Sequence, residues 1–260
     1  MAQDNAEPRK GTAGQRKAAA RQRRERQKRQ QTYVIAGVMV VVVALVIVFI
    51  AYSSRPVEIT MPADLAQFEG VEAGVTDAGF FRLGSADAPV VMDDFSNFTC
   101  SHCADFHGST LRRLIDGQIA EGTLSVVFYP VVTGEQQSLL GAQAAVCAGQ
   151  QDPKLFWEMG DVLFMWLRTA NYPYYQGHVE EAARRLGLDM GAFGSCMGAQ
   201  ETMDLLRAAA DEATLREVAG TPAFFFNGAR PVCGGADPKC EGNLPYELVV
   251  QNIDRHLAGR

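Results

Sequence analysis

The sequence predicts an α/β domain that is interrupted by an all-helical segment and preceded by one transmembrane helix. Three observations support this prediction. Residues 33–52 form an uncharged apolar run that is long enough to cross a bilayer. Residues 90–129 follow a strand–helix–strand pattern, with a Cys-x-x-Cys pair between the first strand and the helix. Helical patterns then fill residues 136–218, before a β-rich run returns at residues 223–226.

The N-terminal tail, residues 1–32, is basic and has no large apolar residue between Met1 and Tyr33. Its first 30 residues carry ten Lys or Arg and three acids, a formal charge of +7. The net charge of the whole chain is −6, so the other 230 residues carry a charge of −13. The composition predicts a disordered or loosely helical tail. A basic run also occurs in nucleic-acid-binding proteins, but the apolar run that follows favours a topology signal, so no nucleic-acid partner is expected.

The apolar run at residues 33–52 has a tyrosine at each end. Twenty helical residues span the ~30 Å hydrocarbon core, and tyrosines are typical of the two membrane interfaces. A cleaved signal peptide is the alternative, but Ala51-Tyr-Ser-Ser54 matches a cleavage site poorly. The positive-inside rule then places the tail in the cytoplasm and the acidic body outside. We expect a single-pass protein of the cell membrane with an extracytoplasmic domain.

Residues 53–77 are predicted to be a linker, and the sequence leaves open whether its Phe68 and Val71 dock on the domain. Residues 78–135 are predicted to be the first part of the α/β domain. A strand is expected at 90–95 and another at 124–129. Between them, apolar residues at three- and four-residue steps predict an amphipathic helix that ends at Gly122: Leu111, Leu114, Ile115 and Ile119. This order implies a parallel strand pair with a right-handed crossover.

The all-helical segment, residues 136–218, is predicted to be an inserted domain. Its helical patterns lie at 139–148, 154–167, 178–186 and 202–218, with breaks at 149–153, 171–173 and 191–194. Residues 219–260 complete the α/β domain with a strand at 223–226, an Asn227-Gly228 dipeptide typical of a hairpin turn, and a helix at 245–257.

Cys100 and Cys103 are the strongest chemical signal. Backbone N–H groups at a helix N-terminus favour the thiolate of the first cysteine, and the thiolate is the species that attacks in disulfide exchange. The alternative is a structural zinc site, which needs four ligands. Only His107 lies close by in the sequence as a third, so a redox pair is favoured and no metal is expected.

Two neighbours of the pair are candidates for tuning it. His102 lies between the cysteines, where an imidazole would stabilise the Cys100 thiolate; an exposed His102 with little effect is the alternative. Asp94 lies on the preceding strand, in a sheet expected to be covered by helices on both faces. A buried carboxyl there could move a proton to or from Cys103, and a solvated acid at the strand end is the alternative.

Two motifs and the helical segment together resemble one protein family. The motifs are Asp-Phe-Ser-Asn-Phe-x-Cys-x-x-Cys at 94–103 and Gly-Thr-Pro-Ala-Phe-Phe-Phe-Asn-Gly at 220–228. With the helical segment between them they resemble the DsbA-like branch of the thioredoxin superfamily, and more closely its membrane-anchored bacterial members. The resemblance covers about residues 80–260. It implies a thioredoxin fold with a helical domain inserted in its middle.

The resemblance also assigns roles to single residues. It implies that Cys100 is the exposed nucleophile, Cys103 the buried partner and Asp94 the buried acid. It implies that Pro222 is a cis proline and that the substrate backbone pairs with the edge at Thr221 and Pro222. On the sequence alone, a proline that begins a strand is unremarkable.

The dipeptide Ser101-His102, between the cysteines, departs from the family pattern. The strongest oxidases of the family carry Pro-His there, so the strength of this chain as an oxidant is left open, and Ser101 is assigned with Thr221 and Pro222 to substrate binding. Thr221 resembles oxidase relatives and the isomerase branch alike, so it does not choose between them.

The other four cysteines are expected to form two structural disulfides. Cys147 and Cys196 lie where some relatives carry a second disulfide. Cys233 and Cys240 flank a short glycine-containing loop and are expected to pair with each other. The alternative for this last pair is a second, regulatory redox site or a shuttle to a partner.

The sequence therefore predicts a membrane-tethered, extracytoplasmic oxidoreductase that donates disulfides to secreted or cell-envelope proteins, without an organic cofactor. The resemblance implies reoxidation by a quinone-linked membrane partner of the DsbB or vitamin K epoxide reductase-like type. A disulfide isomerase or reductase is the first alternative. A non-catalytic, copper-handling or chaperone-like module is the second, although the methionines and histidines form no tract that would favour copper.

Overall fold

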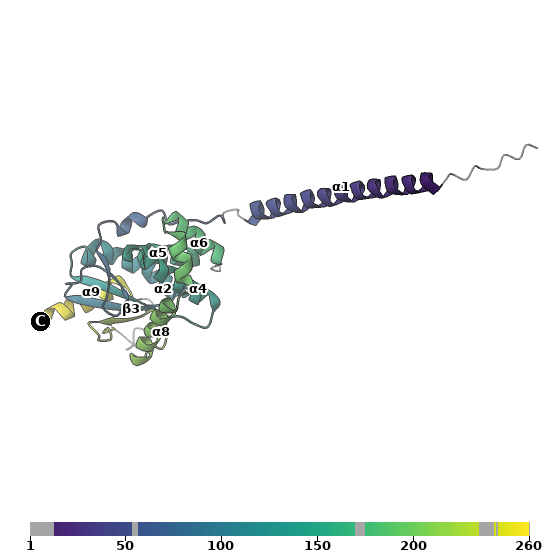
Figure 1. The fold of residues 1–260 in the computed structure, drawn as a ribbon. Helices are drawn as coiled ribbons and strands as arrows, with labels where there is room; N and C mark the ends of the chain where they lie inside the picture. Colours follow the sequence, from purple (N-terminus) through teal and green to yellow (C-terminus); the bar gives the residue numbers. More distant parts are fainter. Residues whose placement is uncertain (1–12, 54–56, 170–174, 234–241, 243, 260) are drawn as a thin grey trace, which may run out of the picture. The chain divides into compact units, whose positions relative to one another are not determined.

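The computed structural model describes residues 13–53, 57–169, 175–233, 242 and 244–259. The chain divides into two compact units, Met1–Pro56 and Val57–Arg260. In the described residues, the first unit holds one long helix, and the second holds a mixed sheet with its covering helices (Figure 1).

Helix α1, Ala13–Ser53, runs without a break for 41 residues. It contains most of the basic tail as well as the predicted span, because Ala, Arg, Gln and Lys are all strong helix formers. Within it, Arg21–Ile50 is the one stretch of the described residues that is long and apolar enough to cross a membrane, judged by length and composition. Large apolar side chains such as Ile47 and Phe49 are exposed along this stretch.

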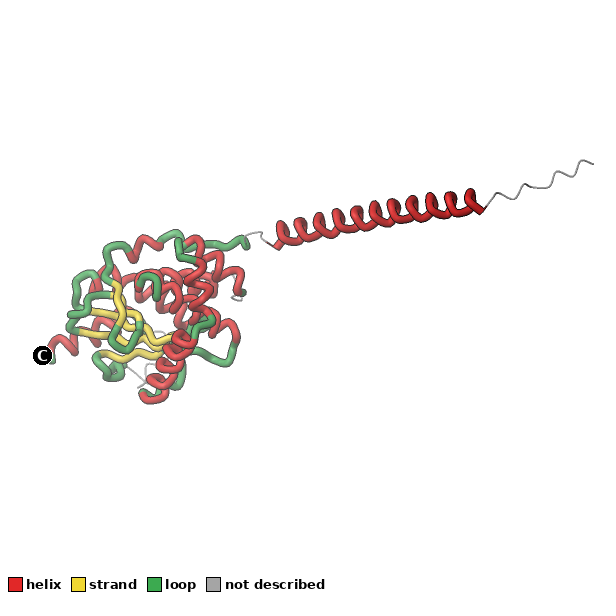
Figure 2. The backbone as a smooth tube through the Cα atoms, viewed as in Figure 1, coloured by secondary structure: helices red, strands yellow, loops and turns green. Residues whose placement is uncertain are grey.

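In the described residues, five strands form one mixed sheet in the order β1-β2-β4-β3-β5. Figure 2 draws these strands in yellow and the helices in red. The strands are β1 Ala73–Val75, β2 Phe81–Leu83, β3 Val90–Ser96, β4 Leu124–Pro130 and β5 Ala223–Phe226. β3 and β4 are parallel, as the strand–helix–strand pattern predicts, and the other neighbouring pairs are antiparallel. β3 therefore lies inside the sheet, whereas β5 forms an edge.

A helical run with two π-helical turns joins β3 to β4. Its parts are α2 Ser101–Asp105, η2 Phe106–Thr110, α3 Leu111–Leu114 and η3 Ile115–Ile119. η2 and η3 are the π-helical turns, and a π-helical turn shifts the direction of the side chains that follow it. The run ends just before Gly122, as predicted, where a φ of 72° favours glycine.

The residues described between β4 and β5 form five helices, and those described after β5 form one more. They are α4 Gln136–Gly149, α5 Pro153–Thr169, α6 Gln176–Arg185, α7 Met190–Met197, α8 Gln200–Leu215 and α9 Tyr246–Ala258. The predicted break at 191–194 is wrong, because α7 occupies it. The Asp189 carboxylate caps α7 by accepting from the backbone N–H of Ala192 (2.8 Å), and the helix buries Phe193.

The sheet is covered on both faces, as the sequence predicts. One face carries the larger core, which Met92 of β3 shares with the helical run, α5 and α9. The other face carries a smaller aromatic core around Phe95, Tyr129 and Phe225, which is closed by small residues of α8. Successive residues of β3 therefore point into two different cores.

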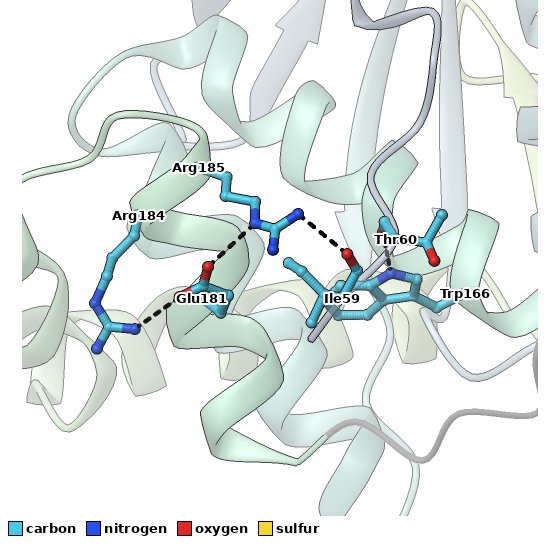
Figure 3. A network of polar contacts seen from close by, with 6 residues as sticks. All are labelled: Ile59, Thr60, Trp166, Glu181, Arg184 and Arg185. Carbon is cyan, nitrogen blue, oxygen red and sulfur yellow. Dashed lines mark hydrogen bonds and ion pairs between the residues drawn. The ribbon is translucent and has the colours of Figure 1, made fainter. Parts of the chain in front are cut away.

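The segment before β2 is part of the folded unit and differs from the linker predicted at 53–77. β1 lies within it, and Phe68 is buried in the main core. Its first described residues are bound to the inserted helices: Trp166 Nε1 donates to the Thr60 carbonyl (2.7 Å), and Arg185 donates to the Ile59 carbonyl (3.1 Å) (Figure 3). Both contacts use backbone carbonyls of this segment, which no side-chain pattern in the sequence could predict.

A disulfide joins two helices of the inserted segment. Cys147 of α4 and Cys196 of α7 are bonded, with their Cα atoms 5.6 Å apart and a sequence separation of 49. Cys147 is buried, and the loop that the bond closes contains α5 and α6.

Replacing both cysteines, Cys147→Ala with Cys196→Ala, is expected to lower the free energy of unfolding by about 4 kcal/mol, the loop-entropy value for a loop of this length. Urea unfolding of the oxidised protein measures the change. A loss below about 1 kcal/mol would contradict the expectation.

Candidate active site

The loop between β3 and α2 is held by Asn97, a buried residue that the sequence analysis did not single out. Its side-chain Oδ1 accepts from the backbone N–H of Thr99 (2.7 Å), from the Thr99 hydroxyl (2.8 Å) and from the Ser138 hydroxyl (3.2 Å). Its carbonyl accepts from the backbone N–H of Cys100 (3.0 Å). Ser138 belongs to α4, so the inserted helices help to fix the loop that carries the cysteines.

Cys100 is the N-cap residue of α2, and Cys103 lies in its first turn. Neither forms a disulfide in this structure. Cys100 is partly exposed, whereas Cys103 is fully buried (0% exposed). The geometry therefore leaves only the first of the two sulfurs open to another molecule.

The pKa values of the two thiols are shifted in opposite directions. A hydrogen bond from the Cys103 thiol, with smaller contributions from the Thr221 side chain and the backbone N–H groups of Cys103 and His102, lowers the pKa of Cys100 to about 5, against the opposing effect of burial. Burial is the main cause that raises the pKa of Cys103, and the nearby Cys100 and Asp94 charges add to it. At neutral pH the exposed sulfur is a thiolate and the buried one a thiol.

Thr221 and Pro222 lie against the cysteines although more than 100 residues separate them in sequence. The Thr221–Pro222 peptide is cis and leads directly into β5. The Thr221 carbonyl accepts from the Cys100 thiol at 3.2 Å. The chain thus brings the edge of the sheet to the exposed sulfur.

Asp94 is completely buried (0% exposed), and two side chains bind it. The Ser96 hydroxyl donates to Oδ1, and Nε2 of His107 lies 2.8 Å from Oδ2. His107 comes from the π-helical turn η2 and is itself buried. The zinc alternative had treated His107 as a metal ligand, and nothing in the sequence pairs it with an acid 13 residues earlier.

Asp93 points to the opposite face of the sheet and is also buried. Its carboxylate pairs with Arg216, the residue that follows α8. Burial raises the pKa of Asp93, and the Arg216 guanidinium opposes the rise. Of the two neighbouring acids, Asp94 therefore lies with the cysteines, and Asp93 belongs to the packing of α8.

The remaining predicted residues lie around or away from this centre. The side chains of Ser101 and His102 are exposed at the start of α2. Cys233 is described, but Cys240 lies outside the described residues, so the pairing of these two stays a prediction. Within the part of the chain that the structure describes, no group of three or more His, Cys, Asp or Glu is arranged to hold a metal.

A family model described as thioredoxin matches residues 76–237, which is well over half of the chain. The chain belongs to the thioredoxin family. The match contains β2 to β5, the cysteine pair, the inserted helices and Thr221-Pro222, which are the parts that build the site.

Comparison with known proteins places this thioredoxin-family chain near disulfide-forming proteins. It is 26% identical over 151 residues to the probable disulfide bond formation protein D of Bacillus anthracis. That match covers 56% of this chain and 69% of the Bacillus protein. The chain is 29% identical over 150 residues to Na(+)/H(+) antiporter NhaA 3 of Salinispora tropica, which covers 56% of this chain. The chain spans only about a fifth (21%) of that antiporter's length.

A solved structure confirms the fold that the resemblance implies. The crystal structure of α-DsbA1 from Wolbachia pipientis superposes with a TM-score of 0.57 at 19% identity, and the match covers 71% of this chain and 94% of that one. The DsbA-like thioredoxin fold predicted from the sequence is therefore correct.

Proposed function

We propose that this chain is a membrane-tethered, extracytoplasmic thiol–disulfide oxidoreductase that donates disulfides to cysteine-containing secreted or cell-envelope proteins. The observation that carries the proposal is the Cys100 sulfur. It is partly exposed at a helix N-terminus and has a pKa lowered to about 5, beside a fully buried Cys103. A pair with one accessible, acidic thiol is suited to disulfide exchange.

The proposed reaction begins with the oxidised protein. A substrate thiolate attacks the Cys100 sulfur, the Cys100–Cys103 bond breaks, and Cys103 leaves and takes up a proton with the help of Asp94. A second substrate thiolate then attacks the substrate sulfur of the mixed disulfide and releases Cys100 as a thiolate. The substrate loses two electrons, and the cysteine pair gains them.

The position of β5 supports the proposed mode of substrate binding. Among the described strands, β5 lies at the edge of the sheet, which is the position at which an extended polypeptide can add a strand; apart from the pairing of β5 with β3, only Phe226, at the end of β5, is already paired, with Ala229. Thr221 and Pro222 precede this strand beside Cys100, and Ser101 is exposed next to the same sulfur. A peptide that pairs with this edge would bring its own sulfur to Cys100.

The membrane placement rests on α1. Its apolar stretch is long enough to span a bilayer, and the basic residues before that stretch favour a cytoplasmic N-terminus. The reduced cysteine pair would then face the extracytoplasmic side and need an oxidant there. As the family resemblance implies, we propose a quinone-linked membrane protein of the DsbB or vitamin K epoxide reductase-like type for this step.

The reduction potential of the Cys100–Cys103 pair tests the proposal. The full chain in detergent is equilibrated against glutathione buffers, and the two thiols are quantified by alkylation and mass spectrometry. Because a stabilised thiolate favours the reduced form, we expect a value nearer to ~−120 mV than to ~−270 mV. A value near ~−270 mV would make the chain a reductase, and the absence of a reversible couple would leave a non-catalytic binding module.

A further inference from the structure

Asp94 and His107 form a buried hydrogen-bonded pair, and the exchange reaction as described uses only Asp94. His107 is 7% exposed and Asp94 0% exposed. The imidazole is held between aromatic rings, stacked on Phe164 at 4.4 Å and edge-on to Phe128 at 5.5 Å. These rings fix the plane of the imidazole and keep Nε2 directed at the carboxylate.

The pair solves an electrostatic problem that a lone Asp94 would face. A carboxyl that gives its proton to the Cys103 thiolate becomes a buried anion, and a buried unpaired charge is strongly disfavoured. A neutral imidazole whose Nε2 carries a proton still donates a hydrogen bond to that carboxylate. His107 can therefore hold the second proton of the pair and stabilise the charge that remains when the proton has left.

His107 also lines a small cavity on the side of α5. The cavity has a volume of about 10 Å³, which is close to the minimum that one water molecule requires. Trp157 Nε1 and Gln67 Oε1 are buried at its wall and have no hydrogen-bond partner among the described residues. One donor and one acceptor in a cavity of this size are suited to a single bridging water.

Asp161 completes the wall of the cavity and connects it to the surface. Its carboxylate is buried and bound by Arg112 through Nη2 at 2.9 and 3.0 Å. Arg112 also reaches the exposed Asp64 at 3.3 Å. Asp161 and Arg112 therefore connect the cavity that His107 lines with the exposed Asp64.

We propose that His107 is a proton-relay residue for Cys103, which acts through Asp94 on one side and through the cavity beside Asp161 on the other. When the Cys100–Cys103 bond breaks, Cys103 takes a proton from the Asp94–His107 pair. The pair keeps a single shared proton between Asp94 and Nε2, and it recovers the lost proton from solvent through the cavity water. The inference rests on the proposed exchange reaction.

The charged groups around the imidazole and its cavity come from three elements. Asp94 of β3 contacts the imidazole, Asp161 of α5 lines the cavity beside it, and the charges of Arg112 of α3, Arg168 of α5 and His107 act on Asp161. The negative charges of the two carboxylates and the positive charges of the two guanidinium groups nearly cancel. A proton that arrives at or leaves His107 is therefore the charge change that the site must accommodate during exchange.

His107→Gln tests the relay, because a glutamine amide can donate the same hydrogen bond to Asp94 but cannot carry a proton. The oxidised full chain in detergent is reduced by dithiothreitol, quenched in acid at timed intervals, and the Cys100 and Cys103 thiols are quantified by mass spectrometry across a range of pH. His256→Gln is the matched control, since this histidine of α9 binds the Asn252 carbonyl instead of a carboxylate. Asp94→Asn and the double variant complete a mutant cycle.

We expect the Cys100–Cys103 disulfide of H107Q to be reduced at least about tenfold more slowly than that of the wild type, which is within the range of general acid–base effects. The pH dependence of this rate should also change. The double variant should be no slower than D94N alone, because two residues of one relay are not additive. H256Q should match the wild type. The titration of the Cys100 thiolate, followed by its ultraviolet absorbance, should stay unchanged in H107Q.

A wild-type rate in H107Q, or losses that multiply in the double variant, would overturn the relay. If H107Q does not fold, Gln67→Met decides, because it replaces the amide at the cavity wall by an apolar side chain of similar size: slower reduction supports the relay and an unchanged rate overturns it. A wild-type chain whose Cys100–Cys103 disulfide dithiothreitol does not reduce would instead contradict the proposed function itself.

Discussion

Cys100→Ser is expected to lower the rate at which the reduced protein exchanges with a small disulfide-containing peptide by at least about 10³-fold. The buried Cys103 cannot replace it, because its side chain has no exposed surface and its pKa is raised by burial. Serine differs from cysteine by one atom, so the variant should fold normally. The loss would therefore report on the chemistry of one sulfur. The rate is measured by mixing the reduced protein with the disulfide-containing peptide and quenching the reaction with acid at timed intervals.

Cys103→Ser is the matched control, because it removes the other sulfur and leaves the nucleophile. This variant should still attack a mixed-disulfide probe but should be unable to release the adduct, so a covalent complex through Cys100 is expected to accumulate. If C100S kept exchange within tenfold of the wild type, the redox assignment of the pair would fail, and the binding-module alternative would gain support.

Local sequence patterns predicted the elements that carry the cysteines. β3 and β4 lie within one residue of their expected bounds, and the strand at 223–226 has the expected bounds. Asn227 and Gly228 have φ of 48° and 80°, as a type I′ turn requires. Period-two and period-3.6 patterns are properties of a few consecutive residues, so a single sequence contains them in full.

Contacts between distant segments were beyond the reach of the same patterns. The sequence placed Asp94 in a covered sheet, but its pairing with His107 depends on the π-helical turn η2, which has no sequence signature. The support of the active-site loop by Asn97 depends on a serine hydroxyl from α4, 41 residues later. Such pairs arise from packing, and spacing along the chain does not encode them.

The boundaries of the folded unit show the same limit. The prolines at 56 and 62 predict a linker over residues 53–77 and leave the docking of Phe68 open. In the structure Phe68 fills the main core, and Trp166 and Arg185 bind the carbonyls of Thr60 and Ile59 (Figure 3). Here the backbone provides the acceptors, and any residue has a backbone carbonyl. The side chains that recognise this segment lie more than 100 residues away.

The stability of the reduced protein is expected to rise with pH between about 5 and 9. The pKa of Cys100 is lowered from an ordinary value of 9.0 to about 5 in the folded protein. In this range the unfolded chain holds a proton on Cys100 and the folded chain does not, so raising the pH favours the folded state. The stabilisation is lost as the pH falls through about 5. Above 9 the raised pKa of Cys103 acts in the opposite direction, because the unfolded chain loses that proton first.

The oxidised protein provides the control, since its Cys100 cannot titrate and its unfolding should lack this rise. The same ionisation halves the pH dependence of the reduction potential. Only Cys103 takes up a proton on reduction between pH 5 and 9, so the potential should fall by ~30 mV per pH unit instead of twice that value. The prediction fails if the stability of the reduced and oxidised forms changes with pH in the same way and the reduction potential falls by ~60 mV per pH unit. Both results together would show that Cys100 keeps its proton. The sulfur that is proposed to leave as a thiolate would then lack the acidity on which the donor role depends.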